Sequence, residues 1–364
     1  MCCTAIPLGC RLKFASVRAD PMAHDSIHTA LGASLRFEDI LRELLMAKYR
    51  SHLPQLGELA FLTDSGLETT LMFNEGLDLP LNAAFTLHAT ATGEKHLRDY
   101  YVRHVAIARA QNTGFVLESA TWRASPDWGA KLGYSLGELT KFNRDSIALM
   151  TSLRDEFETP QMPMPISGNI GPRGDGYFPE QQMTSDEAQR YHAFQAEIFA
   201  DTEADLISAF TMTHAGEAIG IVRAAVSVGM PVVISFTTET DGRLPSGETM
   251  RDAIERTDDE TSGAPAYYLI NCAHPVHFAD ALANNETWVK RVRGIRANSS
   301  MRSHAELDNS PDLDTGDPID LGRRYAQLRG ILGTRFNVMG GCCGTDHRHV
   351  EAIAEACLPC RAAA

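Results

Sequence analysis

The feature of this sequence that most restricts its fold is a regular alternation that begins after residue 58. Eight short apolar runs of strand length follow one another, at 59–63, 114–117, 164–168, 205–210, 231–236, 267–271, 292–297 and 335–340. Longer segments with helical periodicity lie between them, such as 185–201 and 216–228. Short buried strands that alternate with helices are typical of an α/β fold with a parallel sheet. Eight such units predict a single closed (β/α)₈ barrel rather than an open doubly wound sheet, and no G-x-G-x-x-G motif follows the first run.

The first fifty residues do not share this alternation. Residues 35–50 place leucine and isoleucine at helical spacing, which predicts an amphipathic helix. The first nineteen residues contain three basic side chains and no acid, which is compatible with an organellar transit signal in residues 1–21 or with a disordered leader. We therefore divide the chain into a leader with an amphipathic helix (1–50) and a barrel (51–364), and we expect deletion of residues 1–21 to leave activity unchanged.

Charge and cysteine content exclude several classes of protein. The net charge of −14 disfavours a nucleic-acid binder that depends on phosphate contacts. No apolar run approaches the roughly 20 residues of a membrane span. Eight cysteines are too few for a secreted disulfide framework, so we expect a reducing, cytoplasmic compartment and small-molecule substrates. The oligomeric state stays open.

Three cysteines follow predicted strands at the end where a (β/α)₈ barrel builds its active site. Cys272 comes after the sixth run, and Cys342 and Cys343 come after the eighth, in a glycine-rich G-G-C-C-G loop. Three thiolates suit Zn²⁺ and leave a fourth position open, as a catalytic site requires. The alternative is a set of inert buried thiols. The Cys357-x-x-Cys360 pair lies near the end of the chain, and we interpret it as a tail without function.

Several further motifs occur along the chain together with this loop. They are LTDSGLETTL (62–71), ESATWRASPDWGAKLGYS (118–135), ISGNIGPRGD (166–175), ISFTTETDGRLPSGET (234–249), INCAHP (270–275), ANSS (297–300) and GGCCGT (340–345). Over residues 58–355 the chain thereby resembles the homocysteine S-methyltransferase family. The resemblance implies a zinc-dependent (β/α)₈ barrel that methylates the thiol of homocysteine to give methionine.

The resemblance also implies roles for individual residues. Cys272, Cys342 and Cys343 would be the zinc ligands, and Asp64 with the turn through Gly66 would hold the amino-acid end of homocysteine. Glu118, Thr211 and Asn298 also follow predicted strands at this end of the barrel, and we expect them to bind substrate. The sequence departs from the family at Ser65, where a second glycine is usual, and at Phe210. The family commonly has a Glu-Thr pair where this chain has Phe210-Thr211, and that glutamate helps to hold the substrate ammonium group. We therefore expect weaker binding of homocysteine unless another acid, such as Glu118 or Glu239, compensates.

The chemistry expected of such a site is attack by a thiolate on a methyl-sulfonium or methyl-ammonium donor. This step merges opposite charges and needs no strong general base. A sulfonium donor (S-methylmethionine or S-adenosylmethionine) is the preferred prediction, with betaine as an alternative donor and a different thiol or a selenol as alternative acceptors. A non-catalytic barrel that holds zinc for stability or redox sensing is the alternative from another class.

Overall fold

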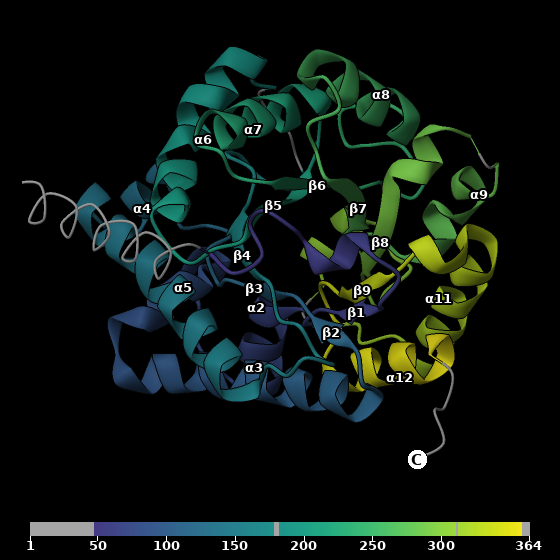
Figure 1. The fold of residues 1–364 in the computed structure, drawn as a ribbon, viewed down its shortest axis with the longest axis horizontal. Helices are drawn as coiled ribbons and strands as arrows, with labels where there is room; N and C mark the ends of the chain where they lie inside the picture. The colour runs from purple at the N-terminus through teal and green to yellow at the C-terminus, as the bar shows by residue number, and fades with distance from the viewer. Residues whose placement is uncertain (1–46, 178–181, 285, 311, 359–364) are drawn as a thin grey trace, which may run out of the picture. The chain divides into compact units, whose positions relative to one another are not determined.

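Nine parallel strands form the centre of the protein, and helices surround them (Figure 1). The computed structural model describes residues 47–177, 182–284, 286–310 and 312–358, which belong to one compact unit that begins at Ala47. The sheet order is β2-β1-β9-β8-β7-β6-β5-β4-β3. The strands are β1 (Phe61–Leu62), β2 (Gly114–Phe115), β3 (Leu117–Glu118), β4 (Ile166–Ile170), β5 (Leu206–Met212), β6 (Val232–Phe236), β7 (Tyr267–Asn271), β8 (Val292–Ala297) and β9 (Val338–Gly341).

The barrel closes where the second predicted strand divides in two. β2 pairs with β1, and β3 pairs with β4, so the two ends of the sheet are consecutive pieces of one stretch of chain. Only Val116 separates them, and its backbone N–H donates to the carbonyl of Leu62. The eight predicted strands thus correspond to the nine observed ones, and the predicted (β/α)₈ barrel is confirmed.

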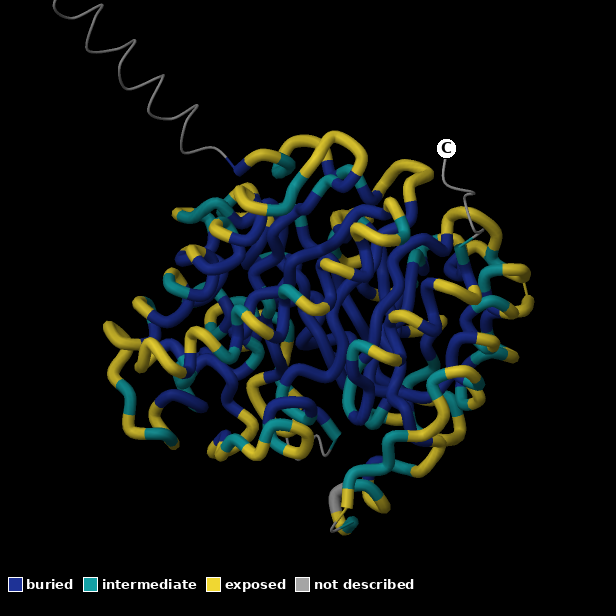
Figure 2. Tube along the Cα trace, turned by 90° about the horizontal axis from the view of Figure 1, so that it is seen from below, coloured by how far each residue is buried: buried dark blue, intermediate teal, exposed yellow. Residues whose placement is uncertain are grey.

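The larger helices lie outside the strands, and their ends agree with the sequence. They are α3 (Ala91–Gln111), α5 (Leu136–Phe157), α6 (Ser185–Ala200), α7 (Ala215–Ser227), α8 (Met250–Thr261), α11 (Pro318–Leu332) and α12 (His347–Cys357). Ser135 and Thr184 begin α5 and α6 with capping boxes that use a glutamate three residues later. Figure 2 shows the buried residues in the interior of the barrel and the exposed residues on its outer helices and loops.

The amino-terminal end of the barrel is closed by residues 53–57. Leu53 packs in the barrel interior, and Gln55 is fully buried. The side chains of Arg293 and Asn337 donate to backbone carbonyls of this segment, including that of Gln55 (3.2 and 3.0 Å). The carboxyl-terminal end of the strands is therefore the end at which a site can open.

Two regions differ from the sequence predictions. Residues 35–46 of the predicted amphipathic helix lie outside the described residues, and residues 48–50 form a turn instead of its last part. The polar, acidic segment 299–318 has a turn-rich composition that predicts a long surface loop, but it contains the short helix α10 (His304–Asp308). Among the described residues, no helix has the length and apolar character needed to cross a membrane.

Candidate functional site

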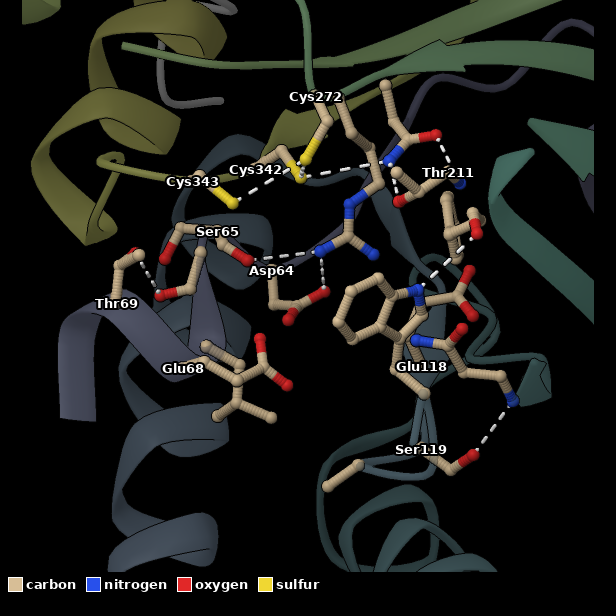
Figure 3. Close-up of a pocket in the computed structure, with 18 of the residues that line it drawn as sticks. Asp64, Ser65, Glu68, Thr69, Glu118, Ser119, Thr211, Cys272, Cys342 and Cys343 are labelled. Carbon is tan, nitrogen blue, oxygen red and sulfur yellow. Dashed lines mark hydrogen bonds and ion pairs between the residues drawn. The ribbon is translucent and has the colours of Figure 1, made fainter. Parts of the chain in front are cut away.

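Three cysteine side chains meet at the carboxyl-terminal end of the barrel. Cys272 directly follows β7, and Cys342 and Cys343 directly follow β9. The Sγ atom of Cys272 lies 2.7 Å from that of Cys342 and 3.5 Å from that of Cys343, and all three sulfurs lie within 4.8 Å of one another. Figure 3 shows the three sulfurs gathered at one point. All three are free thiols, so this cysteine triad can offer three sulfur ligands to one ion.

Glycine allows the loop after β9 to pack closely against its neighbours. A Cβ atom at Gly66 would lie 2.5 Å from the carbonyl oxygen of Cys342. Gly344 has a φ of 78°, a conformation that favours glycine over other residues. Gly66 therefore supports the cysteine loop by close backbone approach.

Asn271 joins the ends of three strands beside Cys272. Its side-chain amide donates to Oγ1 of Thr211, and its Oδ1 accepts from the backbone N–H of Thr211 (2.9 Å each). The hydroxyl of Ser235 donates to the same Oδ1 (2.7 Å). Thr211 and Cys272 have φ values of 65° and 53°, which are uncommon for residues with a side chain. Strained backbone of this kind concentrates at functional sites.

Asp64, which we expected to hold the amino-acid end of the substrate, is paired with a buried arginine. Nη2 of Arg296 lies 2.7 Å from Oδ1 of Asp64, and the hydroxyl of Tyr100 donates to Oδ2 (3.1 Å). Arg296 also donates to the backbone carbonyls of Ser65 and Gly341 (3.0 Å each). Burial disfavours the guanidinium charge, but the carboxylates of Asp64 and Glu118, with smaller contributions from Cys342 and Tyr100, together outweigh this effect and raise the pKa of Arg296. Asp64 therefore holds a cation in the site and is not a free carboxylate.

Glu118 at the end of β3 offers a carboxylate oxygen without a partner. Its Oε1 accepts from the hydroxyl of Ser208 (3.3 Å), whereas the buried Oε2 has no hydrogen-bond partner among the described residues. Burial raises the pKa of Glu118 to about 7, although the charge of Arg296 opposes this shift. Glu118 can therefore change its charge near neutral pH, and it can accept one further hydrogen bond.

Phe210 and Glu239 have surroundings that differ from those of Glu118. Phe210 lies within β5, and the Cζ atom of Arg296 lies 4.8 Å from the centre of its ring. Glu239 pairs with His304 (3.1 Å) and does not line the cavity that contains the other site residues. Of the two acids that we expected to compensate for Phe210, the structure thus brings only Glu118 into this cavity.

These side chains line a cavity of about 610 Å³, called here the inner cavity. Four of the five residues predicted to bind substrate contribute to its wall, namely Asp64, Gly66, Glu118 and Thr211, as do the three cysteines. Asn298, the fifth, lines a different cavity, and its side-chain amide donates to the carbonyl of Cys272 (3.1 Å).

A second cavity of about 1090 Å³, the outer cavity, adjoins the first. The two cavities share five wall residues, which are Glu68, Thr69, Trp122, Tyr177 and Cys343. Residues of the 298–314 segment, including His304 and Asp314, also line the outer cavity. Cys343 lines both cavities, whereas Cys272 and Cys342 line only the inner one, so the cysteine triad meets the boundary of the two chambers at Cys343. This geometry suits a reaction between two substrates.

Several residues of this site were not among those predicted from the sequence. The hydroxyl of Tyr177 lies 3.2 Å from Sγ of Cys272 and 3.4 Å from Sγ of Cys343. Glu68 lines both cavities, and burial raises its pKa to about 7. Arg296 was visible as one of two arginines in the predicted strand 292–297, and a charge in a buried strand is a signal of a paired or functional group. No comparable signal marked Tyr177 in the sequence.

Comparison with known proteins places this geometry in a family. A family model described as homocysteine S-methyltransferase matches residues 61–357, which is most of the chain. The chain belongs to the homocysteine S-methyltransferase family. Members of this family are methyltransferases, in agreement with the resemblance seen in the sequence.

Two curated proteins that match part of this chain are named as homocysteine S-methyltransferases. Betaine–homocysteine S-methyltransferase 1 of Rattus norvegicus is 26% identical over 183 residues, which cover 45% of this chain and 42% of that protein. The S-methylmethionine–homocysteine S-methyltransferase of Mus musculus is 25% identical over 45% of this chain and 48% of its own length. The chain thus matches less than half the length of these curated relatives.

Crystal structures of the homocysteine methyltransferase MmuM from Escherichia coli have the same fold. The oxidized form has a TM-score of 0.66 at 18% identity and covers 84% of this chain and 98% of MmuM. The metallated form has a TM-score of 0.64 at 18% identity and covers 82% of this chain and 96% of MmuM.

Proposed function

We propose that this protein transfers a methyl group from a sulfonium donor, S-methylmethionine or S-adenosylmethionine, to the thiol of homocysteine to form methionine. The observation that carries the proposal is the cysteine triad at the boundary of the two cavities. Among the described residues, no fourth Cys, His, Asp or Glu joins this group. Three protein ligands are typical of a catalytic zinc site, because the fourth position is left for the substrate.

The residues around the triad fit a zinc ion. Cys272, Cys342 and Cys343 would hold it, and when bound it would stabilise the substrate thiolate near neutral pH. The neighbouring thiol of Cys272 and the charge of Arg296 help to lower the pKa of Cys342, which favours the thiolate form that binds metal. The side-chain amide of Asn271 donates to Sγ of Cys342 (3.8 Å) and helps to orient it.

The inner cavity provides complementary charges for the amino-acid end of homocysteine. Glu118 accepts a hydrogen bond from the substrate ammonium group at Oε2, which has no partner among the described residues. Arg296 donates to the substrate carboxylate from Nη1. This nitrogen makes no hydrogen bond to any residue that the structure describes. Glu118 thereby takes over the role that Phe210 cannot perform.

The transfer itself requires orientation and exclusion of water. The homocysteine sulfur, after loss of its proton, attacks the methyl carbon of the donor, and the electron pair of the broken bond returns to the donor sulfur. Trp122 and Tyr177, in the wall between the cavities, present aromatic groups to the positive sulfonium. Neutralisation of opposite charges favours this step without a general base.

The proposal is tested with the zinc-loaded protein and variants of the triad. We expect about one zinc per chain and formation of methionine from homocysteine and a sulfonium donor. The double variant Cys342→Ala/Cys343→Ala should lose both zinc and activity, whereas Cys357→Ala should keep both. Cys357 is the matched control because it is also a buried free thiol, at the end of α12. Full zinc occupancy in the double variant would contradict the proposal.

Further assays on the zinc-loaded protein distinguish the proposed function from the other donors, the other acceptors and a non-catalytic zinc site. Pairing sulfonium donors and betaine with several thiols and a selenol identifies the preferred substrates. The zinc–sulfur spectrum should gain a fourth sulfur when homocysteine is added. A spectrum that does not change, together with no methyl transfer from any donor, would indicate a structural or redox-sensing zinc site.

A further inference from the structure

A buried arginine that forms no ion pair with any described carboxylate lines the outer cavity. Arg123, in the segment that follows β3, is 8% exposed. Its Cζ atom lies 3.6 Å from the ring centre of Trp128 and 4.7 Å from that of Trp122. The guanidinium group is therefore held between two large aromatic side chains, which fixes its position and leaves its N–H edge available.

Arg123 forms no ion pair or hydrogen bond with any residue in the ranges 47–177, 182–284, 286–310 and 312–358, and its Nε is buried without a partner. Other buried arginines of this protein are neutralised directly. Arg154 pairs with Asp205 (3.2 Å), and Arg296 pairs with Asp64 (2.7 Å). A buried charge without a partner is costly, so an unpaired guanidinium in a cavity wall indicates an anion that binds there.

The position of Arg123 indicates which anion this is. Arg123 lines the outer cavity and not the inner one. The outer cavity reaches the cysteine triad through the wall that contains Trp122, Tyr177 and Cys343. A donor in this cavity would have its methyl-bearing cation beside that wall and could place a second, anionic group on the guanidinium.

We propose that Arg123 binds the carboxylate of the methyl donor in the outer cavity. The donor is then an onium compound that carries both a transferable methyl group and a carboxylate. This inference rests on the proposed function, because it assigns the donor side of the same reaction. The planar guanidinium matches a carboxylate through two parallel hydrogen bonds, and a neutral carboxamide cannot accept them with equal strength. Arg123 is thus a specificity-determining residue for the donor.

The test compares S-methylmethionine with its carboxamide as donors for the zinc-loaded protein. The wild-type protein should show a KM for the carboxamide that is higher by roughly 10- to 150-fold, the range expected for hydrogen bonds to a charged group. Arg123→Met should raise the KM for S-methylmethionine by a similar factor and abolish the difference between the two donors. The KM for homocysteine and the zinc content should not change.

Lys131→Met is the matched control, because Lys131 also stacks on Trp128 (4.0 Å) but lines neither cavity. This variant should retain the preference for the carboxylate donor. If Arg123→Met keeps the preference, or changes the KM for homocysteine instead, the assignment of Arg123 to the donor is wrong.

Binding without turnover separates this inference from the proposed function. Trp122 and Trp128 are two of the three tryptophans in the chain, so S-methylmethionine added without acceptor should change the tryptophan fluorescence. We expect the change in the wild type and in Lys131→Met and its loss in Arg123→Met. Binding that follows this pattern without methyl transfer would contradict the proposed function and support the anion site. Methyl transfer with equal use of both donors would contradict only the anion site.

Discussion

Single side chains in the inner cavity carry opposite charges that are arranged for an amino acid. Arg296 is fixed by Asp64 on one side and by backbone carbonyls on the other, so its position does not depend on substrate. Glu118 is buried and has one oxygen without a partner among the described residues. The cavity therefore keeps recognition of an ammonium and a carboxylate, although the carboxylate expected at position 210 is absent.

The first prediction concerns Glu118. Glu118→Gln should raise the KM for homocysteine by roughly 10- to 150-fold at pH 8, because a hydrogen bond between two charged groups is lost. The pKa of Glu118 is raised to about 7 by burial, so the carboxylate is ionised above that pH and protonated below it. The ratio of the variant KM to the wild-type KM should therefore shrink as the pH falls from 8 to 6. A ratio that does not depend on pH would assign ammonium binding to another group.

The second prediction concerns Phe210. A carboxylate introduced by Phe210→Glu would lie close to Arg296 and compete with Asp64 for its guanidinium group. We expect the KM for homocysteine to stay the same or to rise, and Phe210→Leu, which adds no charge, to show a smaller effect. A lower KM for homocysteine in Phe210→Glu would show that Glu118 does not compensate for the missing acid.

The sequence predicted the cysteine triad because adjacent cysteines in a glycine loop are hard to explain by packing. It did not predict the pairing of Asp64 with Arg296. Those two residues are more than two hundred positions apart, and their contact depends on the closure of the barrel. The sequence did not indicate that Tyr177 and Arg123 belong to the site. The reason is similar, because several separate loops form the cavity wall that contains them.

At the level of elements, β9 and the loop after it determine where two of the three sulfurs lie. β9 pairs with β1 on one side and with β8 on the other, so the loop position depends on close contacts with both neighbours. A Cβ atom at Gly340 would collide with the side chain of Thr63 and lie 2.7 Å from the carbonyl oxygen of Asp64. The alternation of apolar runs predicted this strand, but the helix within 299–318 was hidden by the polar composition of that segment.

The third prediction tests this contact. Gly340→Ala should lower the free energy of unfolding by about 1–3 kcal/mol, the usual cost of overpacking, and should reduce zinc content because the cysteine loop is displaced. Gly330→Ala is the control, since a Cβ there meets no atom within 4 Å and the position is exposed on α11. That change should raise stability by roughly 0.5–1 kcal/mol. Urea unfolding and metal analysis measure both effects. Equal stability of the two variants would contradict the proposed close packing.

At the level of the whole molecule, the described part of the chain has an extensive apolar core that does not include the cysteine triad. The strands β4 to β7 are almost completely buried, and the helices outside them pack on the same core. A barrel of this kind does not need a metal to fold, in contrast to a small zinc domain.

The fourth prediction follows from this separation of core and metal site. Removal of zinc with a chelator should abolish activity while leaving the far-ultraviolet circular dichroism spectrum unchanged. The Tm should fall only by the stabilisation that ligand binding supplies, and it should recover when zinc is restored. Loss of the helical signal on chelation would show that the metal is part of the folding core.

The closed amino-terminal end of the barrel has a consequence for the order of events during turnover. Leu53 and Gln55 block that end, so both reactants must enter and leave at the carboxyl-terminal end of the strands, where the outer cavity adjoins the inner one. If the acceptor binds in the inner cavity and the donor in the outer one, the acceptor must arrive first and its product must depart last. We therefore expect a compulsory-order kinetic pattern in which methionine, the last product to leave, competes with homocysteine and does not compete with the donor. Initial-rate measurements with S-adenosylmethionine as donor, whose demethylated product differs from methionine, test the expectation with methionine as inhibitor. Methionine that does not compete with homocysteine would show that the two chambers fill independently.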